Sequence, residues 1–130
     1  PGVGLLDVRT TRAPGPRLIG NAAIETELPG IDTRVLAGFE NHGGRTELGP
    51  GAQPLGRVLR GHGNDGASGQ EGARARNVIG TYLHGPLLPK NVWFADWLIA
   101  TALDLPIVLA DLDDGLEQQA HADACAAAGL

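Results

Sequence analysis

The chain has 130 residues and a formal net charge of -5, a length that suits one domain with a buried core. Its apolar fraction is 42%, yet no apolar run approaches the roughly 18 residues of a membrane span. No basic stripe with interleaved aromatic residues indicates nucleic-acid binding. We therefore expect a cytoplasmic protein that does not span a membrane or bind nucleic acid. The single cysteine, Cys125, excludes an internal disulfide.

The opening segment, PGVGLLDV, has the pattern of a turn that runs directly into a strand. A domain rarely starts in this way, so we expect further residues to precede Pro1.

Most of the chain predicts strands. Short runs of β-forming or alternating residues are bounded by Gly, Pro or Asn, which is the pattern of strands between turns. The predicted strands span residues 3–10, 22–28, 34–40, 55–61 and 77–85. The glycines Gly43 and Gly44 permit either a turn or a close approach of two backbones. The glycine-rich segment 61–72 predicts an exposed loop.

After residue 90 the apolar period changes to that of a helix. Asn91 is a candidate N-cap. The residues expected on the buried face are Val92, Ala95, Ile99, Ala102 and Leu103. Trp93 and Trp97 are four residues apart, a spacing typical of packing in a core or an interface.

The C-terminal segment, residues 104–130, contains six acidic residues and neither Lys nor Arg, so it carries -6 and the rest of the chain +1. Within it, residues 106–112 predict a short strand. The alanine-rich residues 115–130 predict a helix with a weak apolar stripe. We interpret this acidic segment as an appended helix or a frayed terminus, with a solvated acidic face.

The strand predicted at residues 77–85 delivers a histidine, His84, immediately before a Gly-Pro break. Ligands of open α/β sheets bind at the carboxyl ends of strands, so His84 is placed as a catalytic base would be. The alternative is that His84 caps the strand and bonds a loop carbonyl.

A second polar group follows the strand at residues 34–40. Glu40, His42 and Arg45 surround the two glycines, and such a group can line a crevice or bind a carboxylate. The alternative is a polar turn in which Glu40 pairs with Arg45. A third hypothesis is a metal site formed by Glu40, His42 and His84.

Two motifs, GTYLHGPLLPKN and GFENHGGRT, carry a family resemblance, supported by LDV and RLIGN earlier in the chain. Together they resemble the class I glutamine amidotransferases of the cobyric-acid-synthase type, in particular the glutaminase subunit of lipid II isoglutaminyl synthase. The resemblance implies that residues 1–103 are the C-terminal part of a flavodoxin-like α/β amidotransferase domain. It also implies a strand-rich fold with one late helix, followed by the appended segment 104–130.

The resemblance implies a glutaminase chemistry. A cysteine thiolate attacks the side-chain carbonyl of glutamine, and a histidine activates the thiol and moves protons. By motif that histidine is His84, and Arg17 is similar to an arginine that holds the glutamine. The ammonia then passes to a Mur-ligase-like, ATP-dependent synthetase subunit, which amidates the D-glutamate of lipid II in peptidoglycan synthesis. The glutaminase subunit itself needs no nucleotide, metal or other cofactor.

The chain departs from the family pattern at the nucleophile. The family's cysteine lies in a glycine-rich elbow before the motifs seen here, whereas Cys125 follows His84 in an alanine-rich segment. We therefore expect the nucleophile-bearing half to be absent and the fragment to be inactive alone. The position two residues after His84, a carboxylate in many relatives, is Pro86. Two other functions stay open: a non-catalytic remnant that binds the synthetase, and an amidotransferase of cobyric acid synthesis.

Overall fold

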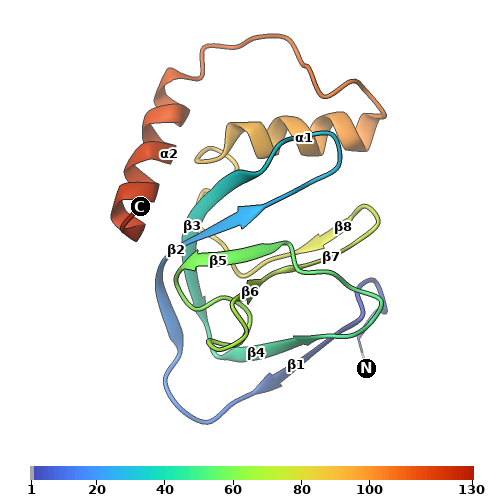
Figure 1. The fold of residues 1–130 in the computed structure, drawn as a ribbon, viewed down its shortest axis with the longest axis vertical. Helices are drawn as coiled ribbons and strands as arrows, with labels where there is room; N and C mark the ends of the chain where they lie inside the picture. Colours follow the sequence, from blue (N-terminus) through green and yellow to red (C-terminus); the bar gives the residue numbers. More distant parts are fainter. Residues whose placement is uncertain (1) are drawn as a thin grey trace.

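A computed structural model describes residues 2–130 (Figure 1). The strands are β1 (Val8–Arg12), β2 (Leu18–Thr26), β3 (Arg34–His42), β4 (Gly44–Leu48), β5 (Gly56–Arg60), β6 (Gln70–Glu71), β7 (Ala73–Ala75) and β8 (Val78–Gly80). The helices are α1 (Val92–Leu103) and α2 (Gly115–Ala128). This confirms the strand-rich α/β class, with a second helix after the late one. Neither helix within residues 2–130 is long and apolar enough to cross a bilayer.

The centre of the fold is a long antiparallel ribbon. Strands β2 and β3 pair along their whole length, from Leu18 opposite His42 to Thr26 opposite Arg34. Strands β1 and β4 pair in the same way further along the ribbon. The two halves are separated by residues 13–17 on one side and by Gly43 on the other. The ribbon is therefore interrupted just beyond the pair formed by Leu18, the first residue of β2, and His42, the last residue of β3.

The ribbon is extended into a four-stranded sheet of order β3-β2-β5-β6, and β7 and β8 form a separate pair. Every strand pair of residues 2–130 is antiparallel. His84 therefore does not lie at the carboxyl end of a parallel strand, as the sequence predicted, but forms an antiparallel bridge. Residues 77–85 form one short strand, β8, and then a single bridge from His84 to Phe39 on the outer edge of β3.

The sequence does not predict strand β4, and it leaves open whether Gly43 and Gly44 form a turn or a close approach. In the structure Gly44 allows a close approach. A Cβ at this position would lie 2.8 Å from both the Thr10 Cγ2 and the Tyr82 hydroxyl oxygen. The chain passes through Gly43 without reversing, and it continues as a strand because β1 offers a partner.

The core lies on one face of the β2–β3 hairpin. Its buried members are Ala22, Ile24, Leu28, Leu36, Leu55, Leu83, Phe94 and Trp97. Helix α1 contributes the last two, and the Trp97 indole N–H donates to the Pro29 carbonyl at 3.0 Å. The predicted buried face of this helix is wrong, since Ile99 is 48% and Leu103 63% exposed. The large aromatic side chains decide which face of the helix is buried, because burying them removes the most apolar surface from water.

Asn91 precedes helix α1, as predicted, but its side chain does not cap the helix. Its amide extends the edge of β3 instead. The oxygen accepts from the Ala37 backbone N–H at 2.9 Å, and the Nδ2 group donates to the Ala37 and Leu87 carbonyls. Asn91 thus satisfies backbone groups that a further strand would otherwise bond.

Helix α2 covers the opposite face of the same hairpin. It contacts β2 and β3, where Ala23 and Ala37 are fully buried. Asn21 donates to the Ala127 carbonyl at 3.0 Å. No residue of α2 is itself buried, so small side chains let the helix approach the sheet without forming a second core.

The segment between the helices contains no strand, so the short strand predicted at residues 106–112 is wrong. Val108 is 87% and Leu112 78% exposed. A strand needs an edge with free backbone groups, and this segment passes outside the sheets where no edge is beside it.

Candidate functional site

The outer edge and C-terminal end of β3 hold the predicted catalytic residue. The His84 backbone N–H donates to the Phe39 carbonyl at 2.8 Å, and the Phe39 N–H donates back at 3.3 Å. Directly opposed residues of an antiparallel pair point to the same face. The two rings indeed meet edge to face, with centroids 5.8 Å apart. His84 is exposed, and no hydrogen bond within residues 2–130 engages its ring.

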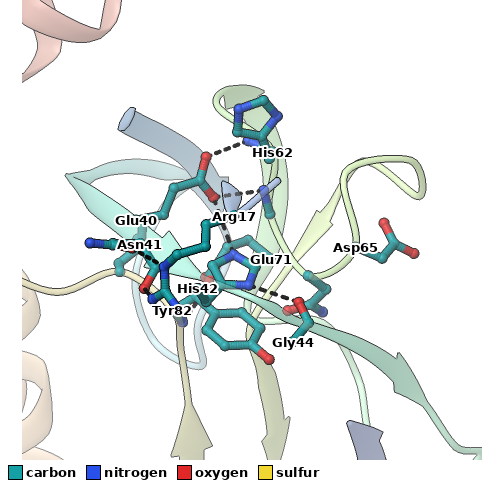
Figure 2. A network of polar contacts seen from close by, with 12 residues as sticks. Arg17, Glu40, Asn41, His42, Gly44, His62, Asp65, Glu71 and Tyr82 are labelled. Carbon is teal, nitrogen blue, oxygen red and sulfur yellow. Dashed lines mark hydrogen bonds and ion pairs between the residues drawn. The ribbon is translucent and has the colours of Figure 1, made fainter. Parts of the chain in front are cut away.

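Arg17 lies at the same end of β3. Its Nε–H donates to the Asn41 Oδ1 at 2.7 Å, and its Nη2 donates to the Asn41 carbonyl at 2.7 Å. Figure 2 shows this guanidinium against Asn41 at the interruption of the ribbon. Asn41 is two residues beyond Phe39, so both side chains belong to the same face of β3. The structure therefore brings the predicted residues His84 and Arg17 to one strand end.

Glu40 occupies the other face of β3 and is fully buried. Its carboxylate accepts from the backbone N–H groups of His62 at 2.6 Å and Gly63 at 3.0 Å. A Cβ on Gly61 would lie 2.8 Å from the Glu40 Oε1. The glycines of this loop thus let its backbone wrap a carboxylate.

Arg45 does not take part in that contact, so the predicted Glu40–Arg45 pair is wrong. Its guanidinium donates to the carbonyls of Gly44 at 3.0 Å and Pro16 at 3.2 Å. Arg45 therefore ties β4 to residues 13–17, the segment that carries Arg17.

His42 is buried beside Glu40. Its Nδ1–H donates to the Gly44 carbonyl at 3.0 Å, while its Nε2 lies 3.7 Å from the Glu40 Oε2 and has no hydrogen-bond partner among residues 2–130. The ring stacks on Tyr82, with centroids 3.6 Å apart and planes 6° from parallel. The Tyr82 hydroxyl bonds the Thr46 hydroxyl at 2.8 Å. His42 thus holds the segment that leads to His84.

Glu71 bonds the same segment through its carboxylate. It accepts from the Tyr82 backbone N–H at 2.6 Å and from the Thr81 hydroxyl at 3.0 Å. Burial raises the pKa of the Glu71 carboxyl to about 7, and the nearby charge of Glu40 acts in the same direction. The hydrogen bonds from Tyr82 and Thr81 oppose this rise because they favour the ionised form.

The metal hypothesis finds no geometric support. Within the described residues 2–130, no three His, Cys, Asp or Glu side chains lie close enough together to hold a metal ion. Glu40 and His42 are neighbours on one face of β3, whereas His84 pairs with Phe39 on the other.

Cys125 lies on α2, where its Sγ is 3.5 Å from the Nε2 of His121. The Nδ1–H of His121 donates to the Lys90 carbonyl at 2.8 Å. Burial raises the pKa of the Cys125 thiol, which opposes the thiolate form that a nucleophile needs. These contacts fit a packing role for Cys125 between α2 and the start of α1.

Sequence reasoning did not single out three residues of this region: Asn41, Glu71 and Tyr82. Asn41 stands between two candidate residues, in the run ENH, so its position could have been found from the motif. Glu71 lies in a glycine-rich segment, where a lone carboxylate has the pattern of an exposed loop residue. Only the fold shows that it is fully buried.

Residues 1–92 match the model of the CobB/CobQ-like glutamine amidotransferase domain. The chain belongs to this family. It is 40% identical over 122 residues to the lipid II isoglutaminyl synthase (glutamine-hydrolyzing) subunit GatD of Staphylococcus aureus, covering 92% of this chain and 47% of the relative. The subunit of the same name from Streptococcus pneumoniae is 40% identical over 102 residues, covering 78% of this chain and 38% of the relative.

Cobyric acid synthases are also similar. That of Pelotomaculum thermopropionicum is 42% identical over 95 residues, covering 65% of this chain and 17% of the relative. The chain thus spans about half or less of the length of the curated relatives that it matches.

Proposed function

We propose that the chain is the histidine-bearing part of a glutamine-hydrolysing amidotransferase that supplies ammonia for amidating the D-glutamate of lipid II. One observation carries the proposal: His84 and Arg17 both contact the C-terminal end of β3, His84 through backbone bonds to Phe39 and Arg17 through Asn41, two residues further along the same face. An exposed imidazole and an exposed guanidinium on one strand end suit a ligand with a reactive carbonyl and a carboxylate.

In this proposal, Arg17 binds the α-carboxylate of glutamine, and His84 transfers protons during attack on the side-chain amide. A cysteine thiol gives its proton to His84 and attacks the amide carbon. His84 then protonates the leaving nitrogen, which departs as ammonia, and a water hydrolyses the resulting thioester. The thiol is assigned to a cysteine elsewhere in the assembled enzyme, because Cys125 is engaged with His121.

His42, Arg45 and Glu40 take supporting roles in the proposal. Glu40 fixes the loop at His62, His42 stacks under Tyr82, and Arg45 anchors the segment before Arg17. None of them is required to touch glutamine.

The partner in this proposal is a Mur-ligase-like, ATP-dependent synthetase subunit that receives the ammonia in the cytoplasm. Two relatives support this assignment, since each is named as a subunit of lipid II isoglutaminyl synthase. Residues 1–103 form the amidotransferase part, and residues 104–130 are an appended segment that packs on it through α2. The chemistry assigned to these residues uses no nucleotide and no metal.

Cobyric acid synthesis is the second candidate. Its support is the similarity to several cobyric acid synthases over about two-thirds of this chain. The lipid II assignment is preferred because its subunit is 40% identical over 92% of this chain, whereas the cobyric acid synthase that matches a similar share, 95%, is 35% identical.

The test is a glutaminase assay on the chain combined with a cysteine-bearing amidotransferase half and a Mur-ligase-like synthetase. We expect glutamate release that His84→Ala reduces by about a thousandfold or more, because members of such a unit act together. His62→Ala is the matched control, since only its backbone is engaged. Full activity in His84→Ala would refute the proposal. Ammonia transfer to a corrinoid acid instead of lipid II would select the second candidate, and assembly without hydrolysis would indicate a non-catalytic binding protein.

A further inference from the structure

The guanidinium of Arg17 is held on one edge only. Its Nε–H and one Nη2–H bond the side-chain and backbone oxygens of Asn41, both at 2.7 Å. A guanidinium has five N–H donors in a fixed plane. The pair of bonds therefore fixes the orientation of the whole group, and it leaves the Nη1 hydrogens and the second Nη2 hydrogen directed away from Asn41.

The charge of Arg17 is not neutralised by this contact. Asn41 offers two uncharged oxygens, and the one carboxylate–guanidinium ion pair within residues 2–130 joins Glu25 to Arg57 and does not involve Arg17. Arg17 is also exposed. An oriented cation with a free donor edge is suited to bidentate binding of a planar anion such as a carboxylate.

We propose that Asn41 is the positioning residue that aims Arg17 at the α-carboxylate of glutamine and thereby sets the affinity for amino-acid substrates. This inference rests on the proposed function and deepens it. Residue 41 accepts one hydrogen bond through its side chain and one through its backbone carbonyl. Its side chain must therefore be an acceptor that carries no charge. An aspartate would accept the side-chain bond equally well, but it would compete with the substrate carboxylate for Arg17.

The register of β3 places the Arg17–Asn41 contact two residues along the strand from the position where His84 pairs. Asn41 is two residues beyond Phe39, which His84 pairs with, and two residues of a strand span about 7 Å. The two ends of an extended glutamine are separated by a few carbon–carbon bonds. A single substrate can thus present its carboxylate to Arg17 and its amide to His84.

The experiment compares Asn41→Asp, Asn41→Ala and Arg17→Ala in steady-state glutamine hydrolysis by the assembled amidotransferase. We expect Asn41→Asp to raise the KM for glutamine by about ten- to a hundredfold, as for loss of a charged hydrogen bond, with kcat changed by less than about threefold. Arg17→Ala should raise KM by the same factor or more. The effect of Asn41→Ala on KM should lie between those of Asn41→Asp and Arg17→Ala. Asn77→Asp adds the same charge at an exposed position and should change neither constant.

A second readout uses the 130-residue chain itself. The Arg17 Nε–H should give a slowly exchanging proton signal in the NMR spectrum, which Asn41→Ala removes. Titration with L-glutamate as the carboxylate probe should shift this signal in the unmodified chain, and not in Asn41→Asp.

The outcomes separate this inference from the proposed function. If Arg17→Ala raises KM while Asn41→Asp leaves it within twofold, Asn41 does not position Arg17 and the inference is wrong, although the glutaminase assignment stands. Equal losses of kcat in both Asn41 variants would indicate a merely structural role. If His84→Ala retains full hydrolysis, the proposed function itself fails.

Discussion

The end of β3 and helix α2 are held in place by opposite means. Around β3, fully buried carboxylates and amides bond backbone groups of other segments, as Glu40 does with the loop at His62 and Asn91 does with Ala37. Helix α2 has no buried residue and rests on the sheet through small side chains and a few polar contacts. The comparison indicates that the strand end is preorganised, whereas α2 can detach at little cost to the sheet.

The largest effect is expected from Glu40→Gln. A glutamine offers one acceptor oxygen in place of two and turns an N–H₂ group toward the donors of His62 and Gly63. We expect a loss of about 2–4 kcal/mol in the free energy of unfolding, because a buried donor is left without a partner. Urea denaturation measures it.

Glu47→Gln is the matched control for this substitution, because Glu47 is exposed on β4, and it should change stability by less than about 0.5 kcal/mol. If Glu40→Gln cost no more than this control, the polar contacts would not be what fixes the strand end.

Because of Glu71, we expect the free energy of unfolding to depend on pH. Its pKa rises from the ordinary 4.5 to about 7 in the folded chain, so between these values the folded state binds a proton that the unfolded state has released. Stability therefore falls as pH rises through this window, by about 3 kcal/mol at most for this group. Above pH 7 both states are ionised and this loss is constant.

Glu71→Gln should flatten that slope, since the amide cannot titrate but still accepts from Tyr82. Thermal or urea unfolding at several values between pH 5 and pH 8 measures the difference from the unmodified chain. An identical slope in the variant would show that another group causes the dependence.

The smallest effect is expected in α2. His121→Ala removes the bond to the Lys90 carbonyl and should cost about 1 kcal/mol. Amide hydrogen exchange should accelerate within α2 while β2 and β3 stay protected. His62→Ala is the control, because His62 is exposed and its ring makes no hydrogen bond in the part of the chain that the structure describes. Equal acceleration in β3 and α2 would contradict the idea that the helix can detach separately.

Much of the fold could be predicted because several of its elements follow from the residue pattern of their own segment. The strand at residues 34–40 and the helix after Asn91 have a local cause in alternation or helical period. The glycine-rich segment 61–72 is exposed as predicted only at residues 61–62 and 66–70, since it also contains β6 and the buried Asn64 and Glu71. The failures have a tertiary cause. Strand β4 exists because β1 lies beside it, and the segment 106–112 lacks a strand because no edge is available to it.

The sequence by itself determined the family and the candidate residues His84 and Arg17, because motifs such as GTYLHGPLLPKN survive as contiguous runs of residues. It also determined the chemistry that those residue types can perform. Only the tertiary structure decided where the candidates lie. Contacts with β3 placed Arg17 at Asn41 and His84 at Phe39, on one strand end. The fold also separated Glu40 from Arg45 by placing the carboxylate among backbone donors. Strand register and burial depend on every neighbouring segment at once, so no local pattern contains them.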